Sequence, residues 1–467
     1  MRHGKLVGIT LLTAAILVPL NCRKATGVER DPRDAEAEQA LIQYIRMDTS
    51  NPPGNETAGA KFLQDLMVKE GIEATLVVSD PQRQSVYARL SAGTNEKALL
   101  LLHHIDVVPA VAGEWTKPPF GGDQSAGYIW GRGALDVKSL GIAELMAFID
   151  LKRRAVPLRR DVIFLAVADE ELGGRRGVKD LLEKNPALFT NVGFVINEGG
   201  YNETVVDRVT FWGIETQQKV PLWLRLNAKG VPGHAASPPP GGGTIASLVR
   251  ALDAVMGIET PYRLTPEVKR FFGEAGKARP DKRGALMQSI SEPLNPKQIE
   301  ETLPPGYRSM LQDTIALTRV TGGSAPNSIP ARASADIDIR LLPGSSADEM
   351  LERVKTAVGS NAEVEILLRG EVVEETPIDT ELYAVLEKAM KADEAGSRVA
   401  AVVSAGTSDS RYFRARGIPS YGVAPFKVNY YDADSVHGTD ERIRARFFIE
   451  GVHLMRRIVS DFAARKK

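Results

Sequence analysis

The chain of 467 residues contains one cysteine and only six histidines. A single cysteine excludes an intramolecular disulfide and any metal site built from thiolates. Neither sign of charge is in excess, because Lys plus Arg and Asp plus Glu each number 59. The molecule therefore has no global field that would attract nucleic acid or anionic lipid, and nucleic-acid binding is disfavoured.

The first 22 residues differ from the rest of the chain. Arg2 and Lys5 precede an uncharged apolar run over residues 6–20, which is typical of an export signal and short for a membrane span. Cys22 follows directly, as in a bacterial lipoprotein signal whose cysteine is lipidated, although the usual small residue before it is missing. We expect an exported protein, either periplasmic or anchored to the membrane through Cys22. A plain signal peptide or an uncleaved anchor stays open.

The length predicts two domains rather than one compact core. Residues 23–35 are charged and without periodicity, which is typical of a tether. From residue 36 to about 217, strand and helix patterns alternate as in a doubly wound α/β sheet, and the same character returns over 371–467.

A different pattern occupies residues 218–370. The predicted order there is β-α-β-β-α-β, the ferredoxin-like α+β arrangement, with residues 256–313 inserted between its first helix and second strand. We therefore predict a two-domain α/β protein, with a mixed-sheet domain of 36–217 plus 371–467 and an inserted domain of 218–370.

Four short segments of the first domain each carry a metal-type ligand. They are ALLLLHHIDVVP (98–109), WGRGALDVKS (130–139), DVIFLAVADEELGG (161–174) and NVGFVINEGG (191–200). Three of them begin as apolar strands and place His, Asp or Glu where the strand stops. Ligands in open α/β sheets gather beyond the carboxyl ends of the strands, so we expect these side chains to converge. Nitrogen and oxygen ligands favour zinc, with manganese or cobalt as alternatives.

Taken singly, the candidate residues are weak evidence. His104 and Asp106 are two apart, which suits a metal-ligating imidazole with a carboxylate behind it. Asp136 lies at a helix start, where a carboxylate is more often a cap. Glu170 and Glu171 project differently, so one can bind metal while the other accepts a proton. Their conjunction is what makes a metal site the better interpretation.

In order along the chain, these motifs resemble the aminoacylase/carboxypeptidase family of dimetal peptidases, metallopeptidase family 20. GRGALDVKS, ADEELGG and NEGGYN are most similar to the branch of carboxypeptidase S and the N-acyl amino acid hydrolases. The resemblance covers residues 36–467. His103 and Val137 depart from residues common in the family, and neither removes a ligand. The resemblance implies a catalytic larger domain, with the inserted domain as a lid or dimerisation domain.

The resemblance also implies the ligands of two divalent ions, most readily Zn²⁺, with Co²⁺ or Mn²⁺ as alternatives. His104, Asp136 and Glu198 would hold one ion, and Asp136, Glu171 and His437 the other, so that Asp136 bridges. Glu170 would be the general base that takes a proton from the attacking water and returns it to the leaving amine.

The remaining implied site residues lie outside the metal ligands. His234 would stabilise the oxyanion in a partner protomer's site, which makes a homodimer through the inserted domain a further expectation. Asn327 and Arg340 match positions that bind the substrate's carboxylate, and the backbone near Gly406 and Thr407 would contact the acyl side. A strand-end surface charge is the alternative interpretation of Arg340.

We therefore expect a zinc-dependent hydrolase that cleaves the amide bond of small peptides or N-acyl amino acids and releases a free amino acid. A specific deacylase of the desuccinylase or acetylornithine deacetylase type is an alternative, although an export signal counts against a cytosolic biosynthetic role. A binding protein that kept the fold and lost the chemistry is disfavoured, because every implied metal ligand and the base are present.

Overall fold

The computed structural model describes residues 31–80, 83–205 and 207–465, so the predicted signal and Cys22 lie outside the described residues. Helix α1 (Pro32–Ile45) begins within the segment expected to be a tether, because Asp31 caps it by accepting a hydrogen bond from the Arg33 N–H. In the part of the chain that is described, no helix is both long and apolar enough to cross a membrane.

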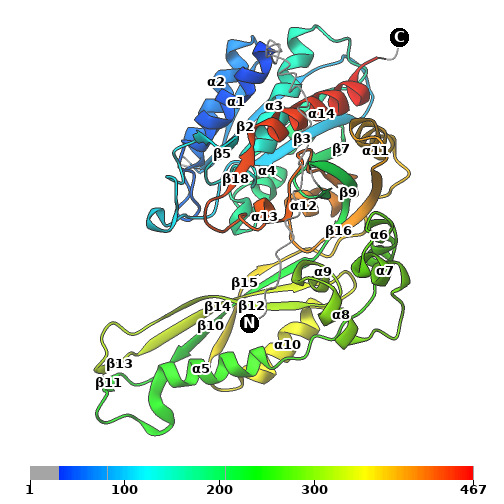
Figure 1. Ribbon diagram of the computed structural model, residues 1–467. Coiled ribbons are helices and arrows are strands. Elements are labelled where there is room, and N and C mark those ends of the chain that lie inside the picture. The colour runs from blue at the N-terminus through cyan, green and yellow to red at the C-terminus, as the bar shows by residue number, and fades with distance from the viewer. Residues whose placement is uncertain (1–30, 81–82, 206, 466–467) are drawn as a thin grey trace, which may run out of the picture.

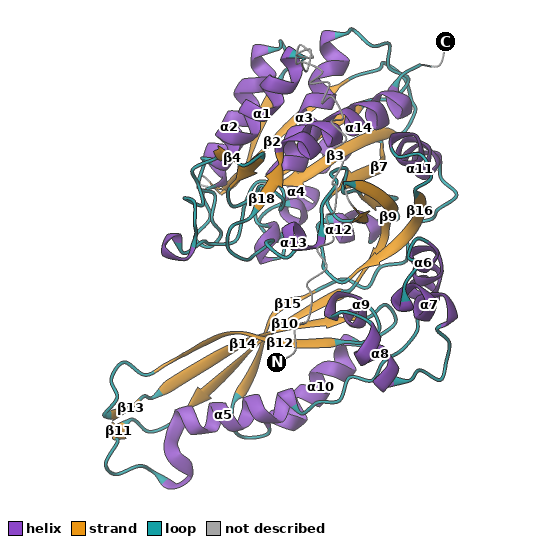
Figure 2. Ribbon diagram, in the orientation of Figure 1, coloured by secondary structure: helices purple, strands orange, loops and turns teal. Residues whose placement is uncertain are grey.

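The larger part of the molecule is built on a nine-stranded mixed sheet (Figures 1 and 2). Its strands, in spatial order, are β1 (Ala74–Asp80), β2 (Arg83–Leu90), β6 (Val162–Val167), β3 (Ala98–His104), β7 (Val192–Asn197), β17 (Ser420–Gly422), β9 (Arg208–Gln218) and β16 (Arg398–Ser404), with β8 (Tyr201–Val205) paired to β9. The central strands β6, β3, β7 and β17 run parallel. Both β3 and β6 are buried along their whole length, as strands covered on two faces must be.

Helices cover both faces of this sheet, which is the doubly wound arrangement. One face packs against α1, α2 (Glu56–Lys69), α3 (Lys138–Arg153), α11 (Glu381–Asp393) and α14 (Ala445–Ala463). The other face packs against α4 (Val178–Lys184) and α12 (Ser410–Arg414). The fold class predicted from alternating strand and helix patterns is confirmed.

The smaller part is a four-stranded antiparallel sheet with two helices on one face (Figure 2). Its spatial order is β12 (Thr314–Gly322), β14 (Arg332–Leu341), β10 (Val220–Lys229) and β15 (Glu363–Arg369), and its helices are α5 (Gly243–Met256) and α10 (Ala347–Val358). Buried and partly exposed side chains alternate along β14, so one face of the sheet meets the helices and the other stays open. The predicted element order of this region is confirmed.

The insertion between α5 and β12 forms four helices that pack on the large sheet, not on the small one. They are α6 (Pro266–Lys277), α7 (Lys282–Ser289), α8 (Pro296–Thr302) and α9 (Pro305–Ser309). Phe271, Phe272 and Tyr307 share an apolar cluster with Phe211 of β9 and Val402 of β16. The insertion therefore covers the face of β16 that α4 and α12 leave open.

Candidate metal centre

The predicted ligands gather at the carboxyl ends of three neighbouring parallel strands of the large sheet, β6, β3 and β7. His104 is the last residue of β3, and Glu198 follows the last residue of β7. Glu170 and Glu171 lie in a short 3-10 turn, η2 (Glu170–Leu172), just after β6. This is the carboxyl end of the sheet, where open α/β folds place their ligands.

The first group of ligands surrounds the His104 imidazole. Its Nε2 lies 3.1 Å from Asp136 Oδ1 and 3.7 Å from Glu198 Oε1. Its Nδ1 lies 2.8 Å from the backbone carbonyl oxygen of Asp106. Because a carbonyl only accepts, Nδ1 donates this hydrogen bond, and Nε2 is the ring nitrogen that faces the two carboxylates.

The second group surrounds His437, which the chain supplies from its far end. His437 Nε2 lies 3.0 Å from Asp136 Oδ2 and 3.3 Å from Glu171 Oε2. Asp136 thus faces one imidazole with each of its oxygens. The structure brings together the two sets of residues that the resemblance implied, with Asp136 between them.

The electrostatics of this cluster fit a bound cation. Burial raises the pKa of Glu170 and Glu198 well above the usual range, and raises that of Glu171. Hydrogen bonds to Asp136 and Glu171 raise the pKa of His437 to about 11. The cluster is short of positive charge, and Glu170 Oε1 and Glu171 Oε1 are buried without a hydrogen-bond partner. Divalent ions held by carboxylates and imidazoles would supply that charge.

Two groups of these residues could each hold a metal ion, and they overlap only in part with the two implied sets, because one group contains Glu170 and neither contains His437. One ligand atom from each of His104, Asp136 and Glu171, and likewise from His104, Glu170 and Glu198, lies within 4.8 Å of the others. The donor set contains imidazole nitrogen and carboxylate oxygen, which suits zinc, manganese or cobalt.

Glu170 is set apart from Glu171 by its surroundings. Glu171 faces His437, whereas Glu170 Oε1 lies 4.0 Å from Nη1 of the buried Arg411. Arg411 also donates to the carbonyl of Gly173 in the same turn and to the Thr407 hydroxyl. Adjacent glutamates thus point to different neighbours.

Asp106 makes a contact other than the expected one. Its carboxylate is 3.7 Å from His104 Nδ1, which bonds to the backbone carbonyl instead. Asp106 Oδ1 accepts the N–H of Glu170 and Oδ2 accepts the N–H of Glu171, each at 3.1 Å. The Asp106 carboxylate therefore holds the η2 turn, and the Asp106 main-chain carbonyl bonds His104.

His234 and Asn327 lie away from this cluster, at the tip of the small sheet. His234 belongs to β11 (Gly233–His234), which pairs with β13 (Ser328–Ile329). The Ala235 N–H donates to the Asn327 carbonyl at 3.1 Å, and both His234 and Asn327 are exposed. Figure 1 shows β11 and β13 at the end of the small domain farthest from the large sheet.

Arg340 lies in the four-stranded sheet, at the end away from this tip, where β14 pairs with the start of β10. Its backbone is opposite Pro221, and its side chain bonds Asp338 and lies over the Trp223 ring. The ten residues of β14 span roughly 30 Å. Arg340 and Asn327 of one chain are therefore too far apart to bind the same carboxylate.

In the loop that carries Gly406 and Thr407, the Thr407 side chain points inward. The Gly406 N–H donates to Ser404 Oγ, and the Thr407 hydroxyl accepts from Arg411 and from Gln218. The Gly406 main chain is exposed, which leaves its backbone open to a substrate.

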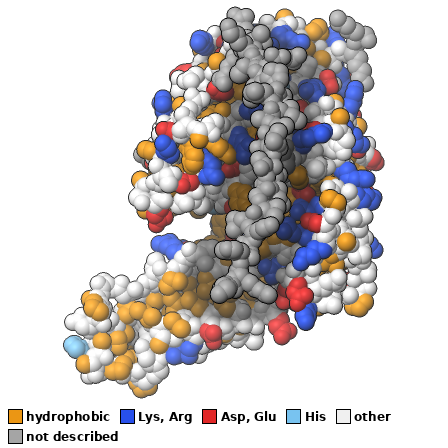
Figure 3. Space-filling view, viewed as in Figure 1, with side chains coloured by type: hydrophobic (Ala, Val, Ile, Leu, Met, Phe, Trp, Pro, Cys, Tyr) orange, Lys and Arg blue, Asp and Glu red, His pale blue; other side chains and the backbone are white. Residues whose placement is uncertain are grey.

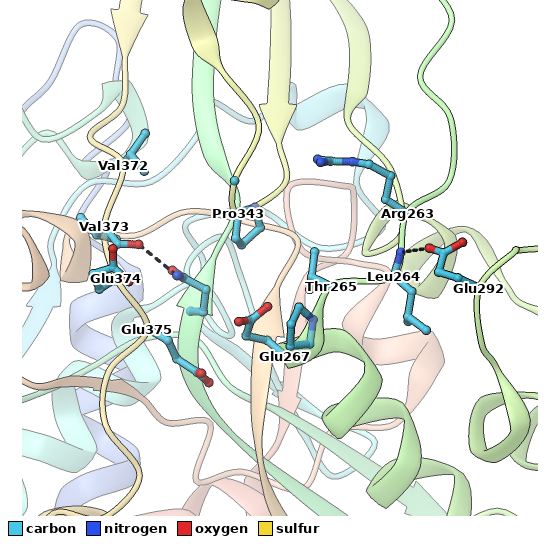
Figure 4. Close-up of a pocket in the computed structure, with 13 residues that line it drawn as sticks. Arg263, Leu264, Thr265, Glu267, Glu292, Pro343, Val372, Val373, Glu374 and Glu375 are labelled. Carbon is cyan, nitrogen blue, oxygen red and sulfur yellow. Dashed lines mark hydrogen bonds between the residues drawn. The ribbon is translucent and has the colours of Figure 1, made fainter.

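A cavity of about 600 Å³ lies apart from the metal cluster, between the insertion and the segment that follows β15 (Figure 4). Glu267, Glu374 and Glu375 line it, and the Leu264 N–H donates to Glu292 at its edge. None of the predicted ligands lines this cavity. We therefore place the candidate active site at the cluster of predicted ligands and not in this cavity.

Several side chains that support the cluster were not singled out from the sequence. Asn51 donates to Asp106 at 2.8 Å, and Arg132 and Glu441 form a buried ion pair beside Asp136. Arg132 lies within GRGALDVKS, and Glu441 lies in the segment SVHGTDER (435–442) that contains His437. A charged residue within a few positions of a candidate ligand was therefore the sequence signal that could have identified each of them.

The model of peptidase family M20/M25/M40 matches residues 100–461. The chain belongs to this family. N-fatty-acyl-amino acid synthase/hydrolase PM20D1 of Xenopus tropicalis is 31% identical over 357 residues, 74% of this chain and 68% of that protein. Aminoacylase-1 of Sus scrofa is 26% identical over 433 residues, 90% of this chain and 94% of that protein.

Solved structures share the fold. Human carnosine dipeptidase 1 superposes with a TM-score of 0.70 at 18% identity, covering 92% of this chain and 97% of that one. The metallo-carboxypeptidase Sso-CP2 of Sulfolobus solfataricus also gives 0.70, at 21% identity, covering 91% and 98%. The protein is thus a hydrolase of the peptidase and aminoacylase type, which acts on amide or peptide bonds.

Proposed function

We propose that the protein hydrolyses N-acyl amino acids, and small peptides by the same chemistry, to release a free amino acid. The observation that carries this proposal is the position of Asp136 between His104 and His437, with one oxygen toward each imidazole. Two sets of three nitrogen and oxygen ligands that share one carboxylate suit a pair of divalent ions. The named activities of PM20D1 and aminoacylase-1 support acyl amino acids as substrates.

Zinc is the preferred ion for this donor set, with cobalt or manganese as alternatives. Bound ions would lower the pKa of a water and polarise the amide carbonyl. Glu170 is not part of either ligand set, and it accepts the proton of the attacking water. It then returns that proton to the leaving amine. Arg411 and the Asp106 carboxylate hold the turn in which Glu170 lies.

We further propose that the working unit is a homodimer through the small domain. Exposed apolar side chains occupy the outer side of α5 and the free edge strand β12, namely Ile245, Val249, Met256, Leu317 and Val320. Figure 3 shows hydrophobic side chains gathered on this arm of the molecule. Such a strip is unusual on a monomer. A partner would supply His234 for the oxyanion and Asn327 for the substrate, while Arg340 acts in its own chain.

Hydrolysis of an N-acyl amino acid panel by the metal-loaded protein tests the proposal. The panel varies acyl length at one amino acid, with dipeptides as a second arm and Glu170→Gln protein as the control. Release of free amino acid from acyl substrates by the parent alone supports the proposal. Activity confined to succinyl-diaminopimelate or acetylornithine would favour a biosynthetic deacylase, and no amidase activity with two ions bound would overturn the proposal.

Export is part of the same proposal, because a charged start followed by an apolar run over residues 6–20 is the pattern typical of an export signal. Mass spectrometry of the mature N-terminus in a bacterial host separates the alternatives. Lipid on Cys22 supports anchoring, an unmodified mature chain without Cys22 supports a periplasmic enzyme, and a retained residue 1 contradicts cleavage.

A further inference from the structure

Two ligands of the cluster come from loops that are 301 residues apart in the chain, Asp136 and His437. A short antiparallel pair brings these loops together. Strand β5 (Tyr128–Trp130) pairs with β18 (Arg442–Arg444), with Trp130 opposite Arg442. The Gly131 N–H extends this ladder to the Glu441 carbonyl at 2.8 Å. Beyond β5 the chain continues to Asp136, and the residues before β18 include His437.

Glu441 holds the Asp136 side of this junction. Its side chain is fully buried, and its Oε1 accepts the N–H of Leu135 at 2.7 Å and the N–H of Asp136 at 3.0 Å. Two hydrogen bonds from adjacent amides to one charged oxygen fix the main chain at the bridging ligand.

Arg132 holds the His437 side. Its Nη1 lies 2.6 Å from Glu441 Oε2, and its Nη2 donates at 2.8 Å to the carbonyl of Gly438, the residue after His437. Its Nε donates to the Val108 carbonyl at 3.1 Å, and the Trp115 ring covers the guanidinium. The planar fork of arginine thus spans three parts of the chain at once.

We propose that Arg132 and Glu441 are positioning residues that hold Asp136 and His437 at the spacing required by the second ion, the one held by Asp136, Glu171 and His437. A buried ion pair is a weak source of stability, because desolvation offsets much of the attraction. The ion pair instead acts through its hydrogen bonds to the main chain, which reach both the Asp136 loop and the His437 loop. The inference rests on the ligand sets of the proposed function.

Metal binding, rather than activity, tests it. We expect the parent to retain two Zn²⁺ per chain after dialysis against a weak chelator, and Glu441→Gln to retain one. Residues that orient ligands typically change metal affinity by about 10–100-fold, and we expect the larger loss at the ion held by Asp136, Glu171 and His437, because two of its three ligands lie at this junction. The ion held by His104, Asp136 and Glu198 should lose less affinity, because only Asp136 lies at the junction and β3 and β7 position the other two ligands.

Arg132→Lys is the second variant, because Glu441→Gln leaves Arg132 with a buried, unpaired charge and can unfold the chain. Lysine keeps the charge and loses the fork, so the same selective loss of one ion is expected. Arg160→Lys is the matched control. Arg160 is also buried and ion-paired, with Glu96 and Glu381, but it lies before β6, at the opposite end of the sheet. It should lower the melting temperature and leave two ions bound.

The outcomes separate this inference from the proposed function. A parent that binds no ions would overturn both. A parent that binds two ions, with both folded variants binding two at parent affinity, would overturn this inference alone. Equal loss of metal in Arg160→Lys would also overturn it, since the effect would then be general instability.

Discussion

At the scale of single residues, the neighbours Glu170 and Glu171 are given different chemistry by a tight turn. The turn η2 directs Glu171 to His437 and leaves Glu170 beside Arg411, with one oxygen unpartnered. A sequence with two adjacent glutamates does not state which one binds metal. We propose Glu171 as the ligand and Glu170 as the base, as the family resemblance implies, and Glu171 is the one of the two that lies beside His437.

Replacing each glutamate by glutamine tests these roles. Glu170→Gln should keep two bound ions and lose about 10²–10⁴-fold in kcat, because only the proton acceptor is removed. Glu171→Gln should weaken one ion. Metal analysis of both purified variants makes the comparison, and loss of metal from Glu170→Gln alone would reverse the assignment.

The raised pKa values of the cluster predict how the metal-free protein responds to pH. Glu170 and Glu198 hold protons more tightly in the folded state than in the unfolded chain, as does His437, whose pKa is raised to about 11. Protonation of these groups favours the folded state, and this contribution to the free energy of unfolding is lost as the pH rises. The loss begins near pH 4.5 for the two glutamates, and it occurs between pH 6.5 and about 11 for His437.

We therefore expect the melting temperature of chelator-treated protein to fall between about pH 6 and pH 9, while zinc restores it most at the higher pH. Thermal unfolding with and without zinc, across that range, is the measurement. A gap between the two forms that narrows as the pH rises would contradict the assignment of these residues as metal ligands.

At the scale of elements, one buried carboxylate adds polar contacts to the apolar packing of the insertion on the large sheet. Glu203 of β8 accepts hydrogen bonds from Tyr201 at 2.9 Å and from Tyr307 of α9, and pairs with Arg279 at 2.5 Å. β8 begins three residues after Glu198, so this contact is close in sequence to a predicted ligand. Sequence periodicity identified an insertion here but not the surface on which it rests.

Removing that carboxylate should loosen the insertion without touching the ligands. Glu203→Gln leaves Arg279 with less compensation, and we expect a loss of about 3 kcal/mol in unfolding free energy, with two ions still bound. Denaturant unfolding followed by metal analysis measures both. Glu301→Gln, on the exposed side of α8 with its partner at 3.9 Å, is the control and should change stability by no more than about 0.5 kcal/mol. A loss of metal in Glu203→Gln would show that the insertion also shapes the site.

At the scale of the whole molecule, one chain holds its proposed substrate residues at two distant ends of the smaller part. Arg340 is near the large domain, whereas His234 and Asn327 are at the far tip. The space-filling view shows an open notch between the two parts of the molecule (Figure 3). A second chain that fills this space would complete a site with its own His234 and Asn327.

Mixing two inactive variants tests whether the site is shared. His234→Ala should lower kcat by about 10²–10³-fold with little change in KM, because an oxyanion donor acts in the transition state. Mixed dimers of His234→Ala and Glu170→Gln contain one site with both an intact base and an intact donated histidine, so part of the activity should return. Subunit exchange without any recovery would show that His234 acts within its own chain or takes no part.

Much of the fold was predictable because local patterns are strong here. The buried runs of β3, β6 and β7 and the alternation of β14 predict strands without tertiary information. The start of α1 was missed, since Asp31 caps a helix whose first residues look like a charged tether. The contact of Asp106 was also missed, because a spacing of two places a carboxylate near an imidazole without stating which atom bonds.

The sequence by itself determined the doubly wound architecture, the family and the set of candidate ligand residues. These depend on residue type, periodicity and order, all of which are local. Only the tertiary structure decided which carboxylate faces which imidazole, where the insertion packs, and that Arg340 and His234 lie at opposite ends of the smaller part. Those features depend on contacts between segments up to 301 residues apart, such as Asp136 and His437, and such contacts exist only once the chain has folded.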